Sequence, residues 1–132
     1  YMCRDFDIGA DDTNETVENK VAQISISMLD EFFANPEKYK PMPQIGTPTY
    51  TKKFTGADEI IDWSKSPIEI HNLVRALGAG RTKINGTDVK ILKTKIEDGE
   101  LKILELQPAG KKPMDWKSFV NGRQCAEIKY GK

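Results

Sequence analysis

The sequence predicts an α+β fold that is mainly β. We expect a small OB-like antiparallel barrel with an inserted helix, preceded by a strand and a long helix. Three observations support this prediction: apolar residues recur at helical spacing in two segments, two-residue turn signals separate extended runs in the second half, and prolines gather between the halves. Small barrels of this kind often bind oligonucleotides, although a fold alone does not establish a function.

Composition limits the class of protein. The 132 residues are 38% hydrophobic and 30% charged, which is typical of a soluble globular chain with a modest core. No apolar run approaches the ~20 residues of a membrane helix, so we expect no membrane partner. Cys3 and Cys125 are the only cysteines and His71 is the only histidine, which favours a reducing compartment and argues against a zinc site.

Charge divides the chain unevenly, although the net charge is zero. Residues 1–40 hold nine acidic and four basic residues, whereas residues 41–132 hold the other 11 acidic and 16 basic residues. The net charges are therefore −5 and +5, which suggests two parts with different partners. We place the domain boundary at residue 40.

The first residues of the chain have the pattern of the middle of a β-strand. Residues 2–8 have the pattern of a strand, so we expect a fragment of a longer protein. Asp11-Asp12-Thr13 offers a helix cap, Glu15 follows Asp12 by three residues, and apolar residues then recur at helical spacing over 14–34. This pattern predicts a long helix.

A proline-rich linker follows, because four of the seven prolines lie within residues 35–48. Residues 47–54 alternate and are rich in Thr and aromatic residues, which predicts a strand.

The second helix has the clearest local signals. Ser66 and Glu69 form a capping box around Pro67, and Gly78 is a plausible stop, so we expect a helix over 67–77. The apolar stripe consists of Ile70, Leu73, Val74 and Leu77.

The rest of the chain has β patterns. Asn85-Gly86 predicts a hairpin between strands at 81–84 and 87–96, and Glu97-Asp98-Gly99 predicts the turn to a strand at 100–107. Apolar residues change phase within both long strands, which predicts a β-bulge. A short helix at 115–121 and a final strand at 124–130 complete the expected barrel.

Basic residues gather on the predicted hairpin strands and in a tight loop, which indicates a track for a phosphate backbone. A solvated sheet face with edge-protecting lysines remains an alternative. Few aromatic residues lie among these lysines, so structured RNA is favoured over stacked single-stranded bases. The candidate nucleic-acid-binding residues are Arg81, Lys83, Lys90, Lys93, Lys95, Lys111 and Lys112.

Four polar or aromatic residues are expected to have structural roles: Asp62 as a local cap, Trp63 as a packed ring, and Asn72 with Arg75 as hydrogen-bonding groups that hold a loop or the linker on the helix. We expect His71 to be a satisfied imidazole at the edge of the core. No nucleophile elbow or Gly-rich phosphate loop occurs, and we expect no catalytic residue and no metal site in this chain.

Several segments resemble the methionyl-tRNA formyltransferase family. Two of them, Ile61-Asp62-Trp63-Ser64-Lys65-Ser66 and Glu69-Ile70-His71-Asn72-Leu73-Val74-Arg75-Ala76-Leu77, resemble the opening of the family's C-terminal domain. Pro43-Gln44 resembles the linker of the family. The barrel that closes the family's C-terminal domain has a segment similar to Gln107-Pro108-Ala109-Gly110-Lys111-Lys112-Pro113-Met114. The resemblance covers nearly the whole chain. It departs after Leu77, where the family's Pro-Trp-Pro-Gly-Ala is replaced by Gly78-Ala79-Gly80-Arg81.

The resemblance implies a two-domain cytoplasmic enzyme that moves a formyl group from 10-formyltetrahydrofolate to methionyl initiator tRNA. Residues 1–40 would be the end of the N-terminal formyl-transfer domain with the start of the linker, and residues 41–132 the rest of the linker and the OB-like C-terminal domain. The family's catalytic motif lies outside this chain. We therefore expect an inactive monomer without a cofactor of its own, whose partners are initiator tRNA and the missing catalytic domain. A nucleotide-sugar N-formyltransferase and a stand-alone RNA-binding module remain alternatives.

Overall fold

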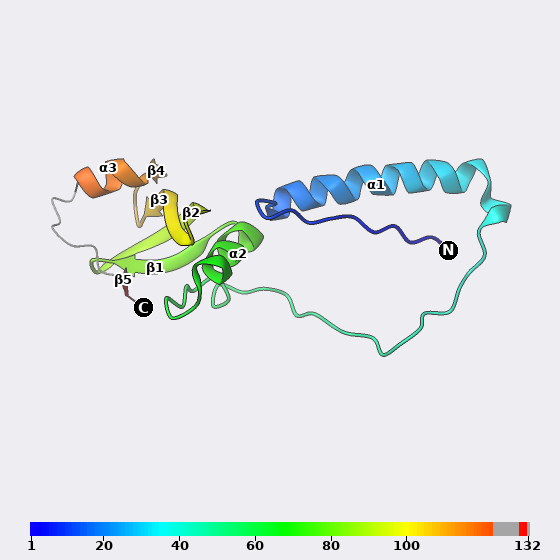
Figure 1. Ribbon diagram of the computed structural model, residues 1–132, viewed down its shortest axis with the longest axis horizontal. Helices are drawn as coiled ribbons and strands as arrows, with labels where there is room; N and C mark the ends of the chain where they lie inside the picture. Colours follow the sequence, from blue (N-terminus) through cyan, green and yellow to red (C-terminus); the bar gives the residue numbers. More distant parts are fainter. Residues whose placement is uncertain (123–129, 132) are drawn as a thin grey trace. The chain divides into compact units, whose positions relative to one another are not determined.

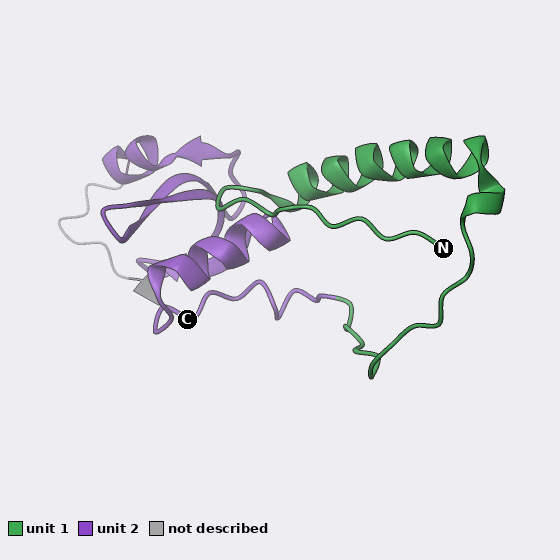
Figure 2. Cartoon of the chain, turned by 45° about the vertical axis from the view of Figure 1, so that its right-hand side comes forward, with its two compact units in different colours: residues 1–53 green, residues 54–132 purple. Residues whose placement is uncertain are grey.

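The computed structural model describes residues 1–122 together with the backbone of residues 130 and 131. It contains two compact units, residues 1–53 and residues 54–132, which we call the first and the second unit (Figure 2). The predicted α+β class, a small antiparallel sheet with helices, is confirmed, although more of the described residues lie in helices than in strands. No helix within the described residues is long and apolar enough to cross a membrane.

The long helix of the first unit, α1 (Asn14–Ala34), is confirmed. Its N-cap is Thr13, whose hydroxyl accepts a hydrogen bond from the Thr16 backbone while the Thr16 hydroxyl accepts one from the Thr13 backbone. This reciprocal pair is a capping box. A short 3₁₀ helix, η1 (Pro36–Lys38), follows α1.

Residues 2–8, all of which are described, form no strand, so this prediction was wrong. A strand needs a neighbouring backbone to complete its hydrogen bonds, and here the segment contacts α1 through side chains instead. Arg4 donates to Glu31 at 2.8 Å and to Ser27 at 3.2 Å, and Tyr1 packs edge-on against Phe32.

The predicted strand at 47–54 is also wrong, because these described residues have no regular secondary structure. Tyr50 and Phe54 are 89% and 67% exposed, so their alternation with polar residues buries no face. Without burial or a paired backbone, β-propensity does not define a strand.

The first helix of the second unit is α2 (Pro67–Leu77), drawn in green in Figure 1. Its predicted bounds and its capping box are confirmed. The Ser66 hydroxyl accepts from the Glu69 N–H, and the Glu69 carboxylate accepts from the Ser66 N–H at 2.9 Å. Gly78 ends the helix at φ 76°, a left-handed conformation that glycine adopts without a Cβ penalty. The helix buries Ile70, His71 and Val74.

Within the described residues, five antiparallel strands form one sheet in the order β4-β3-β2-β1-β5. They are β1 (Gly80–Ile84), β2 (Thr87–Glu97), β3 (Glu100–Pro108), β4 (Met114–Asp115) and β5 (Tyr130–Gly131), and the short helix α3 (Trp116–Asn121) follows β4. The two predicted turns are confirmed: Asn85, Gly86, Asp98 and Gly99 all have positive φ. Such pairs match the twist of the flanking strands. Residues 124–129 of the predicted last strand lie outside the described residues, and closure of the sheet into a barrel stays a prediction.

The predicted change of phase in the long hairpin is confirmed, and it consists of two bulges. Ile91 pairs with Leu106, Lys93 with Glu105, and Thr94 with Ile103. Leu92 is thus an extra residue on β2, and Leu104 is an extra residue on β3. The second shift cancels the first, so the strands leave the bulges in the register with which they entered.

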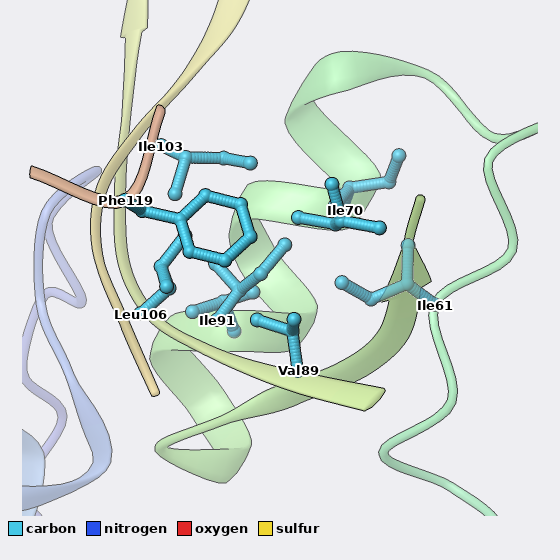
Figure 3. Close-up of a cluster of buried hydrophobic side chains, with 9 residues drawn as sticks. Ile61, Ile70, Val89, Ile91, Ile103, Leu106 and Phe119 are labelled. Atoms are coloured by element: carbon cyan, nitrogen blue, oxygen red, sulfur yellow. The ribbon is translucent and has the colours of Figure 1, made fainter. Parts of the chain in front are cut away.

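The core of the second unit lies between α2 and the inner face of the sheet (Figure 3). Its fully buried side chains include Ile61, Ile84, Ile91 and Leu106. Gly80 allows a close approach here, because a Cβ at this position would lie 2.6 Å from Ile61 Cδ1. The buried hydrophobic residues are Ile61, Ile70, Val74, Ile84, Val89, Ile91, Ile103, Leu106 and Phe119.

Candidate nucleic-acid interface

The outer face of the sheet carries the predicted basic residues of β1 and the first half of β2. Along β1, Arg81 and Lys83 are exposed while Thr82 and Ile84 are buried. Along β2, Lys90 is exposed between Val89 and Ile91, both buried. Because side chains alternate between the two faces of a strand, these cations all point away from the core.

Strand register aligns these cations in rows across the sheet. Arg81 lies opposite Lys90, and Lys90 lies opposite Gln107, so the three side chains form one row across β1, β2 and β3. Lys83 lies opposite Asp88 in the next row. Directly opposed residues have Cβ atoms about 5 Å apart, close enough for one ligand to contact several of them.

A groove of about 570 Å³ lies over these rows. Its described lining includes Ile60, Arg81, Lys83, Asp88, Lys90 and Gln107, together with the turn at residues 108–110. Three hydrogen bonds among the described residues hold that turn. The Lys111 N–H donates to the Pro108 carbonyl at 3.0 Å, the Ala109 N–H donates to the Asp88 carbonyl at 2.9 Å, and Gln107 Nε2 donates to the Lys111 carbonyl at 2.9 Å.

The turn end of the β2–β3 hairpin is neutralised by its own acidic residues. Lys95 contacts Glu97 at 2.6 Å, and Lys102 contacts Glu100. These hydrogen bonds lower the pKa of the Glu97 and Glu100 carboxyls, so both stay charged beside their lysines. Lys93, at the bulge, is likewise paired with Glu105 at 2.9 Å.

At the groove end of the hairpin, fewer basic side chains are paired with acidic ones. Arg81 donates to Glu59 at 2.5 Å, whereas Lys83 and Asp88 are 4.0 Å apart, at the limit of an ion pair. Within the described residues, Lys90, Lys111 and Lys112 have no ion-pair partner. Positive charge that is free to meet a phosphate is therefore concentrated around the groove and its turn, rather than along the whole hairpin.

The residues with predicted structural roles lie on the other side of the sheet or beside it. Asp62 accepts from the Ser64 N–H and hydroxyl, as a local cap does. Trp63 Nε1 donates to Thr82 Oγ1 at 2.8 Å, and buried His71 Nδ1 lies 2.8 Å from Thr94 Oγ1. These contacts account for the half-buried ring and the imidazole as parts of the core.

Asn72 and Arg75 hydrogen-bond to each other on α2, where Arg75 Nε donates to Asn72 Oδ1 at 2.9 Å. Asn72 is exposed and Arg75 is half-buried. That the pair also holds a loop or the linker on the helix stays a prediction.

Glu59, Asp88, Glu105 and Gln107 were not among the site residues predicted from the sequence. Two of them could have been found by counting back from the turns. Asn85-Gly86 places Lys83 opposite Asp88, and Asp98-Gly99 places Lys90 opposite Gln107, as the structure has them. Glu105 could not be found in this way. Counting from the turn places Leu104 opposite Lys93, whereas the bulges at Leu92 and Leu104 bring Glu105 there instead.

Comparison with known proteins identifies a family. Residues 53–100 match the family model described as the formyl transferase C-terminal domain. The chain is also 32% identical to a methionyl-tRNA formyltransferase of Coprothermobacter proteolyticus, over 94% of this chain and 50% of that protein. The chain belongs to the formyltransferase family, and the resemblance noted in its sequence is confirmed.

Two further methionyl-tRNA formyltransferases are similar to this chain to about the same degree. The enzyme of Symbiobacterium thermophilum is 33% identical over 87% of this chain and 45% of its own length. That of Thermodesulfovibrio yellowstonii is 31% identical over 94% of this chain and 49% of its own length. The chain thus spans about half the length of these formyltransferase relatives, and the groove is built partly from residues of the matched C-terminal domain.

Proposed function

We propose that this chain is the tRNA-binding portion of a methionyl-tRNA formyltransferase. The whole enzyme would transfer the formyl group of 10-formyltetrahydrofolate to the methionyl group on initiator tRNA, at the start of protein synthesis in the cytoplasm. The similarity to methionyl-tRNA formyltransferases over nearly the whole chain carries this proposal. The cations around the groove support tRNA as the partner of this part.

The role of the second unit would be to hold the RNA backbone. Lys90 lies between Arg81 and Gln107, and Lys111 and Lys112 follow the turn beside the groove. Such cations gain affinity by displacing counterions from phosphates, without choosing a base sequence. No aromatic side chain is among the described residues that line the groove, which favours backbone contacts over base stacking.

The first unit would join this portion to the catalytic part of the enzyme. α1 has no buried residue, and several of its large apolar side chains are exposed, namely Val21, Ile26, Leu29 and Phe33. An uncovered apolar face of this kind is typical of a surface that packs against another part of a protein. Because the relatives are about twice as long as this chain, we assign that cover to the catalytic domain of the same polypeptide.

The test is binding of the 132-residue chain to initiator tRNA, to duplex DNA and to a nucleotide sugar, each titrated with salt. We expect tight tRNA binding whose logarithm falls linearly with the logarithm of salt concentration. In K90Q the slope should fall by about 0.7 to 0.9, the value for one phosphate contact. The control K93Q/E105Q removes a neutral pair and should keep the slope.

The outcomes separate the candidate functions. An absence of tRNA binding at low salt would reject the proposal for this chain and leave the lysines as a solvated face. Binding of the nucleotide sugar without tRNA would favour a sugar formyltransferase instead. A slope that changes equally in K90Q and K93Q/E105Q would show that the groove is not where the phosphates lie.

A further inference from the structure

Two hydrogen-bond acceptors lie among the cations of the groove. The Asp88 side chain is 74% exposed and faces Lys83, from which it is 4.0 Å away. Gln107 shares a row with Lys90 and Arg81 and also lines the groove. A surface that only held phosphates would gain nothing from a carboxylate in this position, because like charges repel.

Asp88 and Gln107 therefore suit a ligand that also donates hydrogen bonds. An ionised carboxylate can only accept. The amide of Gln107 is oriented by its Nε2 donation to the Lys111 carbonyl, which leaves Oε1 as the acceptor. Among the described residues, no group donates to this oxygen. The groove thus combines donors for an anion with two acceptors for hydroxyl groups.

A ribonucleotide has this combination, because its 2′-hydroxyl donates a hydrogen bond a short distance from the phosphate. Double-stranded RNA displays 2′-hydroxyls and phosphates together along its wide, shallow minor groove. The groove volume of about 570 Å³ falls within the usual range for sites that take a nucleotide-sized group.

We propose that this groove discriminates RNA from DNA. Lys90, which has no ion-pair partner among the described residues, contacts phosphate oxygens, and Asp88 and Gln107 accept hydrogen bonds from ribose 2′-hydroxyls. This inference rests on the proposed tRNA-binding function and adds to it the residues that recognise the sugar. A free nucleotide has the same chemistry, but Lys111 and Lys112 extend the positive charge beyond one nucleotide, which favours a polymer.

The experiment compares a short RNA hairpin with a 2′-fluoro hairpin of the same sequence. Fluorine keeps the A-form geometry and removes the hydroxyl donor, so helix shape is held constant. We expect the full chain to bind the RNA about three- to tenfold more tightly than the 2′-fluoro hairpin, the effect of one or two exposed hydrogen bonds. Uridine monophosphate serves as the free-nucleotide probe and should bind far more weakly.

Three variants assign the effect to residues. D88A and Q107L should each bring the affinity ratio towards one without lowering the salt slope, and D88A should strengthen binding of the 2′-fluoro hairpin by removing a negative charge. K90Q should weaken both hairpins and leave the ratio unchanged. The control D98N changes an acidic residue in a turn outside the groove, where Asn tolerates the positive φ, and should keep the parent's ratio.

The results distinguish this inference from the function on which it rests. Equal binding of the two hairpins with a steep salt slope would overturn the discrimination and leave tRNA binding intact. Binding to neither hairpin would overturn both. A ratio that survives in D88A and Q107L, with far-UV circular dichroism showing folded protein, would reject these two residues as the acceptors. Uridine monophosphate binding as tightly as the RNA hairpin would reject the polymer as the ligand.

Discussion

The two main helices begin with the same kind of cap but differ in how much of their surface is buried. α1 and α2 both start with a capping box, formed by Thr13 with Thr16 and by Ser66 with Glu69. α1 has 21 residues and buries none of them, whereas α2 has 11 residues and buries three. Helix boundaries are therefore set by local hydrogen bonds in both units, while burial depends on what the rest of the chain places against the helix.

The difference matters for stability. α2 is fixed by its packing on the sheet, so its helical structure should be lost together with the core of the second unit. α1 is held by its own hydrogen bonds and by contacts with the segment before it, such as the pair of Arg4 and Glu31. Both tryptophans of the chain, Trp63 and Trp116, lie in the second unit, so their fluorescence reports on that unit alone.

The largest expected effect comes from Leu106, which is fully buried on β3. L106A should lower the free energy of unfolding of the second unit by about 3 kcal/mol, because it removes apolar contacts and leaves a cavity. The matched control is L104A, two residues earlier on the same strand, where the side chain is 41% exposed and the cost should be below about 1 kcal/mol. Urea unfolding followed by tryptophan fluorescence measures both, and equal costs would contradict the inward and outward assignment.

Removing the two caps tests the comparison directly. S66A should cost the second unit about 1 kcal/mol, since the helix loses an N-cap and the loss is transmitted to the core. T13A should reduce the helical signal of α1 in far-UV circular dichroism and leave the tryptophan-detected midpoint unchanged. A shift of that midpoint in T13A would show that the two units unfold together.

The smallest expected effect is a change with pH in the first unit. Asp12 accepts hydrogen bonds from Lys20 at 2.5 Å, from the Gly9 N–H and from the Thr16 hydroxyl, and these lower the pKa of its carboxyl from 3.8 to about 2. A depressed pKa means that the folded state favours the charged form. The stabilisation that the charged Asp12 carboxylate gives to the folded first unit is therefore complete above pH 3.8 and is lost as the pH falls through about 2.

An NMR titration of the Asp12 carboxyl measures this change, and the contact between Lys20 and Asp12 should disappear over the same interval. D12N should abolish the transition. D5N, which changes another exposed acidic residue of the same segment, should leave it in place. A midpoint near 3.8 for Asp12 would show that these hydrogen bonds do not form in solution.

Much of the second unit could be predicted from local signals. Ser66 and Gly78 gave the correct bounds for α2, and the Asn85-Gly86 and Asp98-Gly99 pairs gave the correct turns. The failures lie in the first unit and the linker, at residues 2–8 and 47–54. A strand there would depend on a neighbouring backbone, and no sequence pattern within the segment shows whether that neighbour is present.

The candidate site was predicted only as a set of basic residues. Sequence spacing could not show that Lys93, Lys95 and Lys102 are paired with acidic residues while Lys90 is not, because pairing depends on register and on the rotamers of long side chains. Arg81 shows the same limit, since its partner Glu59 precedes α2 and reaches β1 only through the fold.

The paired bulges at Leu92 and Leu104 have a consequence for how this hairpin can change over evolution. Deleting either residue alone would remove one bulge and keep the other, because neither Leu92 nor Leu104 belongs to the pairs that flank them, Ile91 with Leu106, Lys93 with Glu105 and Thr94 with Ile103. Deleting both would restore a regular ladder with each remaining side chain on its present face. We therefore expect either position to accept a single-residue deletion independently of the other, so that a gap opposite one of them in a relative need not be matched by a gap opposite the other.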